Sequence, residues 1–132
     1  MKLPAICAAN VALAIAIGAF GAHALKDRIT PELLEVFKTG HSYHLGIGIA
    51  AFLLALIAAE KSERFLSKAV GALLVGTVIF SGSLYALALT GIRIFGAITP
   101  LGGLLWIGTW TAVAVYLWNK PMGTQLVAEP SD

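Results

Sequence analysis

The chain has 132 residues, of which 58% are hydrophobic and only 12% are charged. Soluble domains carry about 25% charged residues, so this composition leaves too little charge to cover a water-facing surface. A net charge of +2 without a dense basic tract argues against nucleic acid as a partner. No segment outside the apolar windows exceeds thirteen residues, which excludes an added soluble catalytic domain.

The charged residues are bunched, and they leave four long windows without Asp, Glu, Lys or Arg. A helix of about 20 apolar residues crosses a hydrocarbon core of about 30 Å. The sequence therefore predicts an all-α, integral membrane four-helix bundle, in one four-span domain over residues 1–120 with a short polar C-terminal tail over residues 121–132. The four windows cover residues 3–25, 39–59, 69–92 and 94–119.

The first half of the chain predicts two spans with a short helix between them. The first span covers about residues 4–25. Thr30 and Pro31 then form an N-cap followed by proline at the first helical position. We expect them to open a short amphipathic helix over residues 31–38 that lies on the membrane surface or leans on the end of the bundle. The second span follows at about residues 42–59.

The second half predicts two further spans. The third covers about residues 66–90, and Gly91 is well placed as its C-terminal cap. Thr99 and Pro100 repeat the N-cap and proline signal, so we expect the fourth helix to begin there and to end near Trp118.

Basic residues give a weak signal for orientation. An even number of spans places both ends of the bundle on one side, with five basic residues against four on the other side. The positive-inside rule then predicts cytoplasmic termini in an inner membrane. The five are Lys2, Lys61, Arg64, Lys68 and Lys120; the four are Lys26, Arg28, Lys38 and Arg93.

Small residues recur along the predicted spans. Lipid tails are as apolar as leucine, so membrane helices associate through close backbone packing, which small residues permit, and through hydrogen bonds between helices. We expect these residues to pack helices together and not to bind a nucleotide. The predicted packing residues are Ala14, Gly18, Ala22, Gly82, Ala86, Gly102, Gly103 and Gly108.

Polar residues inside the spans form a candidate intramembrane face. Thr77, Ser81 and Tyr85 share one helix face through their four-residue spacing. Asn10 and Thr77 both lie about 12 Å from the same membrane edge, so we expect Asn10 to pack towards Thr77 or Ser81. The face joins helices by hydrogen bonds or lines a polar pathway, and the first interpretation is favoured. It comprises Asn10, Thr77, Ser81 and Ser83.

A second polar cluster is predicted at the end of the bundle away from the termini. Three imidazoles there could bind a metal or a haem, or receive a proton, but interfacial or structural roles are favoured because histidines three residues apart are a nonspecific signal. We therefore expect no metal, no cofactor and no catalytic residues. The cluster comprises His23, His41, Tyr43, His44, Tyr85, Arg93 and Thr99.

Four motifs resemble a known family: GAFGAHAL at 18–25, FKTGHSY at 37–43, FSGSLYALALTG at 80–91 and ITPLGG at 98–103. In this order they are similar to the small inner-membrane proteins of domain of unknown function 423 and to eukaryotic transmembrane protein 256. The resemblance implies a four-span protein of the bacterial cytoplasmic membrane, without an established reaction or substrate.

The family motifs correspond to particular residues of this chain. Relatives have a histidine where this chain has Ile47, which weakens the metal hypothesis. The matching residues are Gly18, Gly21, His23, Tyr43, Ser81, Gly82, Ser83, Tyr85, Thr99, Pro100, Gly102 and Gly103.

Three hypotheses for function follow from these features. The first is a non-enzymatic protein of the lipid bilayer that associates with itself, as a homo-oligomer, or with a larger membrane complex. The second is a pathway for a small solute or an ion along the polar face. The third is metal or haem binding at the histidines.

Overall fold

The structure, a computed structural model, describes residues 2–120 except for the side-chain surroundings of Ala22. The predicted tail over residues 121–132 lies outside the described residues. Four helical stretches are long and apolar enough to cross a membrane, which confirms the predicted all-α class. The elements are α1 (Lys2–Ala16), the π-helix η1 (Ile17–Gly21), α2 (Ala22–Leu25), α3 (Pro31–Glu60), α4 (Arg64–Thr90) and α5 (Ile94–Asn119).

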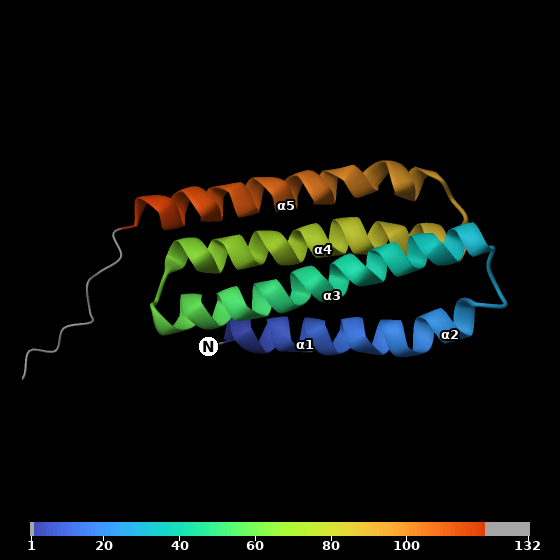
Figure 1. Cartoon of the computed structure of the whole chain (residues 1–132), viewed down its shortest axis with the longest axis horizontal. Coiled ribbons are helices and arrows are strands. Elements are labelled where there is room, and N and C mark those ends of the chain that lie inside the picture. The colour runs from blue at the N-terminus through green and yellow to red at the C-terminus, as the bar shows by residue number, and fades with distance from the viewer. Residues whose placement is uncertain (1, 121–132) are drawn as a thin grey trace, which may run out of the picture.

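The four stretches lie side by side in the order α1, α3, α4, α5, and Figure 1 shows them from bottom to top. Helix α3 packs against α1 and α4, and α4 packs against α5. Within the described residues α1 and α5 make no extensive contact with each other, so each of them has one main neighbour. The beginning of α1 and the end of α5 lie at the same end of the molecule.

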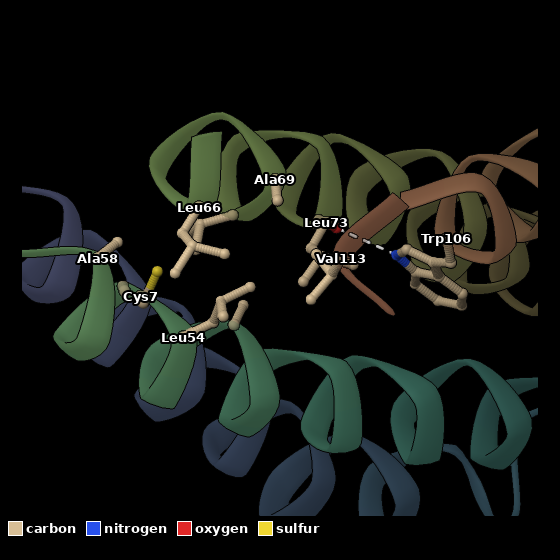
Figure 2. Packing of buried hydrophobic residues seen from close by; sticks show 11 residues of the cluster. Cys7, Leu54, Ala58, Leu66, Ala69, Leu73, Trp106 and Val113 are labelled. Atoms are coloured by element: carbon tan, nitrogen blue, oxygen red, sulfur yellow. Dashed lines mark hydrogen bonds between the residues drawn. The ribbon is translucent and has the colours of Figure 1, made fainter. Parts of the chain in front are cut away.

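An apolar core fills the half of the molecule that contains these two ends. Figure 2 shows Cys7 of α1, Leu54 of α3 and Leu66 of α4 pointing towards one another, and all three are buried. Nearer the middle of α4, the indole N–H of Trp106 donates to the Leu73 carbonyl at 3.1 Å. This bond connects α5 to the backbone of α4 at the place where the apolar core ends.

Helices α4 and α5 approach each other closely at two glycines. A Cβ atom on Gly102 would lie 2.6 Å from the backbone nitrogen of Phe80 and 2.8 Å from the carbonyl oxygen of Gly76. A Cβ atom on Gly76 would lie 2.5 Å from Nε1 of Trp106. Because the neighbours of Gly102 include backbone atoms, no side-chain rotation could make room, and this contact requires glycine.

The predicted separate amphipathic helix over residues 31–38 is wrong, because this segment forms the first turns of the continuous helix α3. Its beginning is confirmed: Pro31 is at the first helical position and the Thr30 hydroxyl accepts a hydrogen bond from the Leu33 N–H at 3.3 Å. The glycine at position 40 does not interrupt the helix. A Cβ on Gly40 would lie 3.0 Å from Cβ of Leu84, so close packing on α4 holds this turn in the helix.

The predicted start of the last helix at Thr99 is also wrong, because α5 begins at Ile94 and Pro100 lies inside it. The Thr99 hydroxyl bonds to the Phe95 carbonyl at 3.3 Å and to the Ser83 hydroxyl at 2.7 Å, so it does not cap a helix. Proline inside a membrane helix is tolerated where neighbouring helices and hydroxyl side chains satisfy the backbone locally. The predicted cap at Gly91 is confirmed by its left-handed φ of 69°.

The turn between α3 and α4 anchors the end of α5. The Tyr116 hydroxyl donates to Oε2 of Glu63 at 2.6 Å, and the Lys120 ammonium donates to Oε1 of the same carboxylate. The hydrogen bond from Lys120, followed by the one from Tyr116, lowers the pKa of Glu63 below its ordinary value. The carboxylate therefore stabilises the fold while it is ionised.

Replacement of Gly102 by alanine is predicted to destabilise the protein by about 1 to 3 kcal/mol, as overpacking does in a closely packed interior. The new methyl group would meet the backbone of α4. Gly108→Ala is the matched control, because a Cβ on Gly108 meets nothing within 4 Å. Reversible unfolding in detergent measures both variants, and equal stabilities would contradict the close approach.

Glu63→Gln is predicted to lower the thermal-unfolding midpoint at neutral pH. Because the folded pKa of Glu63 is lowered from 4.5, its contribution is fully present above that value and is lost as the pH falls through the lowered folded pKa. The difference between wild type and variant should therefore shrink in acid. Glu60→Gln, at an exposed position near the same turn, serves as the control. A difference that is independent of pH would refute the ionic anchor.

Candidate functional site

A pocket of about 200 Å³ lies between α1, α3 and α4, and we name it the intramembrane pocket. Its polar side chains come from all three helices, whereas its apolar lining comes from α1, η1 and α4. The polar residues are Asn10, His44, Thr77, Ser81 and Tyr85. The remaining residues are Leu13, Ile17, Val78 and Gly82.

A chain of hydrogen bonds crosses this pocket from α1 to α4. The Asn10 Oδ1 atom lies 3.1 Å from Nε2 of His44, and the Tyr85 hydroxyl lies 3.1 Å from Nδ1 of the same ring. A carbonyl oxygen can only accept, so Nε2 of His44 donates to Asn10. A neutral ring then accepts at Nδ1 from the Tyr85 O–H. His44 thus connects three helices with one imidazole.

Two donors that belong to pocket-lining residues have no hydrogen-bond partner among the described residues: Nδ2 of Asn10 and Oγ of Ser81. Ser81 is only 1% exposed. Thr77, one turn earlier on α4, differs because its hydroxyl donates to the Leu73 carbonyl at 2.9 Å. A buried polar group without a partner costs about 1 to 3 kcal/mol, so these two atoms need an explanation.

The wall beside the pocket combines a π-helix with aromatic rings. Phe37 of α3 packs on the Tyr85 ring with centroids 5.3 Å apart, and it lies against Gly21 of η1. The His41 ring lies against Gly18 of the same π-helix. The two glycines of η1 therefore make room for rings from α3. Single π-helical turns occur frequently at functional sites.

The structure divides the predicted cluster of polar residues at the bundle end. His44 and Tyr85 face the intramembrane pocket. Tyr43 lies on another side of α3, where its ring packs with Phe80 at 4.9 Å and with Trp106 at 5.7 Å between centroids. Successive helical residues point about 100° apart, so neighbours in sequence do not share a face.

The remaining members of that cluster lie elsewhere. Thr99 joins α5 to α4 through its 2.7 Å bond to Ser83, while Arg93 and His23 are exposed. Ser83, which we assigned to the polar face, thus contacts α5 and does not line the intramembrane pocket. In the part of the chain that the structure describes, no three His, Cys, Asp or Glu side chains lie together as a metal site would require.

The predicted packing residues also have different surroundings. Ala14 is buried, and a Cβ atom on Gly103 would lie 3.6 Å from the Phe80 ring. Ala86 is partly buried, and the structure does not describe the side-chain surroundings of Ala22. Cβ atoms on Gly82 and Gly108 would meet nothing within 4 Å, so these two glycines face open space.

Sequence reasoning placed Asn10 near Thr77 or Ser81, and these residues do line one pocket. The bond from Asn10 to His44 was not predicted. The second span was expected to start near residue 42, which would place His44 at the membrane edge and not at the depth of Asn10. One available signal was Gly48, one turn after His44. A Cβ atom there would lie 3.0 Å from Nδ2 of Asn10, so this glycine makes room for the amide.

Comparisons with known proteins agree with the motifs. A family model described as "Protein of unknown function (DUF423)" matches residues 17–103. UPF0382 membrane protein YwdK of Bacillus subtilis is 43% identical over 109 residues, covering 82% of this chain and 89% of that protein. A UPF0382 membrane protein of Haemophilus influenzae is 36% identical over 100 residues, covering 76% and 80%. No solved structure matches significantly.

Tyr85→Phe is predicted to destabilise the fold by about 0.6 to 1.7 kcal/mol, between the mean and the maximum measured for hydrogen bonds between membrane helices. The substitution keeps the ring beside Phe37 and leaves Nδ1 of His44 without its donor. Tyr43→Phe is the matched control, because Tyr43 is half exposed and its described contacts are made by the ring. Unfolding in detergent compares the two, and an equal loss would argue against the chain of hydrogen bonds.

Proposed function

The chain belongs to the DUF423 family of uncharacterised membrane proteins, and we propose that it acts without catalysis, by self-association within the membrane. The one observation that carries this proposal is a groove on the outer surface of α4 and α5. Small residues of both helices form part of its lining, and a Cβ atom on Gly108 would meet no atom of the described chain within 4 Å.

The α4–α5 groove, as we name it, has a volume of about 390 Å³. Ala72 contributes from α4, and Gly108 and Ala112 contribute from α5 at a four-residue spacing. A Cβ on Gly108 meets no atom within 4 Å. Small residues four apart on a membrane helix allow a second helix to approach its backbone closely. The groove therefore offers the kind of surface on which a transmembrane helix packs.

The packing of α5 favours a second copy of this chain as the occupant. Helix α5 packs extensively only on α4, and 22% of its most apolar window is buried. Most of its surface is thus free to contact lipid or protein. A two-fold dimer would place Gly108 and Ala112 of each copy in the groove of the other, so one patch supplies both sides of the interface.

The hypothesis of a continuous pathway has less support than association. The polar residues of the intramembrane pocket lead towards an apolar core in which Cys7, Leu66 and Leu73 are 2% exposed or less. A water-filled route would have to pass through this core. Haem or metal binding by His44 also has less support, because both of its ring nitrogens already have hydrogen-bond partners.

The proposal includes a location and an orientation. We place the chain in the bacterial cytoplasmic membrane with both termini in the cytoplasm. The turn between α3 and α4 lies on the same side as both described ends and contains Lys61, while Arg64 begins α4. Short basic loops favour the cytoplasmic side.

Ala112→Cys is predicted to yield a disulfide-linked dimer when native membranes are oxidised, because position 112 lies in the proposed interface. The chain's one natural cysteine, Cys7, is buried and should not react. Ala114→Cys is the matched control, since two residues along a helix turn the side chain by about 200°. Both positions are exposed in the structure.

A third variant tests whether the groove itself is the interface. Gly108→Leu, combined with Ala112→Cys, should suppress the disulfide-linked dimer by filling the groove. A monomeric mass in several detergents, together with no crosslinking of Ala112→Cys in membranes, would refute self-association.

A further inference from the structure

We propose that the intramembrane pocket binds the neutral, carbonyl-bearing ring of a lipid-soluble quinone. This proposal is independent of self-association, because the pocket lies between α1, α3 and α4 whereas the groove lies between α4 and α5. Four properties of the pocket lead to this class of ligand: its free donor, its lack of charge, its size and its apolar rim.

A free donor identifies the chemistry that the ligand must offer. Oγ of Ser81 and Nδ2 of Asn10 are buried, and neither has a hydrogen-bond partner among the described residues. Both can donate, and in a membrane no bulk water satisfies them. The Asn10 amide nitrogen lies beside Gly48, which does not line the pocket, so the donor that a ligand in the pocket would reach is Ser81, and an acceptor oxygen there would remove its cost. Quinone carbonyls are such acceptors.

The residues that line the pocket carry no full charge in their ordinary states. Asn10, Thr77, Ser81 and Tyr85 are neutral, and His44 is the one histidine among them. The Asn10 amide oxygen and the Tyr85 hydroxyl fit a neutral His44 ring, as its two hydrogen bonds indicate. A carboxylate or phosphate would lack a counter-ion here, whereas a neutral carbonyl compound needs none.

The size and rim of the pocket limit the ligand further. An engineered cavity of about 150 Å³ binds benzene, so a pocket of about 200 Å³ has room for a single six-membered ring. Leu13 of α1 and Val78 of α4 form its rim and are 54% and 74% exposed. These apolar side chains lie on spans, so the pocket opens towards lipid. The ligand must therefore dissolve in the bilayer and enter from the side.

Depth separates a quinone from the other common source of carbonyl oxygens, the esters of phospholipids. Asn10 lies eight residues beyond Lys2, or about 12 Å along α1. Ester carbonyls belong to the interfacial region of the bilayer, whereas a quinone ring can move within the hydrocarbon core. The pocket depth favours the quinone.

The test uses the full chain in nanodiscs of phosphatidylethanolamine and phosphatidylglycerol. An azidoquinone photolabel is crosslinked in the presence of increasing decylubiquinone, and labelled residues are identified by mass spectrometry. We expect saturable labelling of α1, α3 or α4 beside the pocket. Labelling that decylubiquinone does not displace, or that lies outside the pocket, would overturn the proposal.

Glycine variants provide a steric test. Gly82→Leu should fill the pocket and weaken displacement by decylubiquinone at least about tenfold, equivalent to about 1.4 kcal/mol. Gly71→Leu is the matched control on the same helix. A Cβ at either position meets nothing within 4 Å, but only Gly82 lines the pocket. Equal affinities of the two variants would refute the assigned site.

Serine variants separate binding from stability. Ser81→Ala should weaken binding about 2- to 10-fold without destabilising the protein, because its hydroxyl has no partner among the described residues. Ser83→Ala should destabilise the protein and leave binding unchanged, since its hydroxyl bonds to Thr99 outside the pocket. Unchanged affinity in Ser81→Ala would remove the donor argument. Labelling seen in detergent but not in phospholipid nanodiscs would indicate a site for lipid esters and would overturn the quinone assignment.

Discussion

The arrangement of these helices depends on close contact between their backbones. Lipid tails are as apolar as the side chains, so exchanging a lipid contact for a helix contact gives no hydrophobic gain. Helices α4 and α5 meet this condition at Gly76 and Gly102, where a methyl group would collide with the opposite helix. Helices α1 and α3 meet it differently, with aromatic rings of α3 lying over the glycines of a π-helix. The first contact uses backbone atoms on both sides, while the second leaves space beside it. The intramembrane pocket lies next to this second contact.

The four spans and several of their ends could be predicted because each depends on local chemistry. Windows without charge mark the spans, Thr30 with Pro31 begins α3, and Gly91 ends α4. The errors arose where distant packing decides the local structure. Gly40 remains helical against Leu84, and Thr99 bonds to a neighbouring helix instead of capping its own. A cap signal describes what a residue can do at a helix end, but it does not show whether the helix ends there.

The candidate site was predictable in composition more than in geometry. Spacing and depth brought Asn10, Thr77 and Ser81 to one level, and these residues do line one pocket. The same reasoning grouped His44 with Tyr43, which the structure places on a different face. The rotation of α3 about its axis determines this difference. That rotation depends on all the contacts that α3 makes, so four apolar windows cannot reveal it.

The continuity of α3 has a mechanical consequence. At about 1.5 Å per residue its 30 residues extend about 45 Å, well beyond a hydrocarbon core of about 30 Å. Its first two turns, with Glu32 and Glu35 exposed, therefore project from the membrane as part of the same rigid rod that holds His44. Because no break separates these turns from the span, their position and that of the imidazole inside the bilayer are mechanically linked. A separate surface helix would have left the two independent.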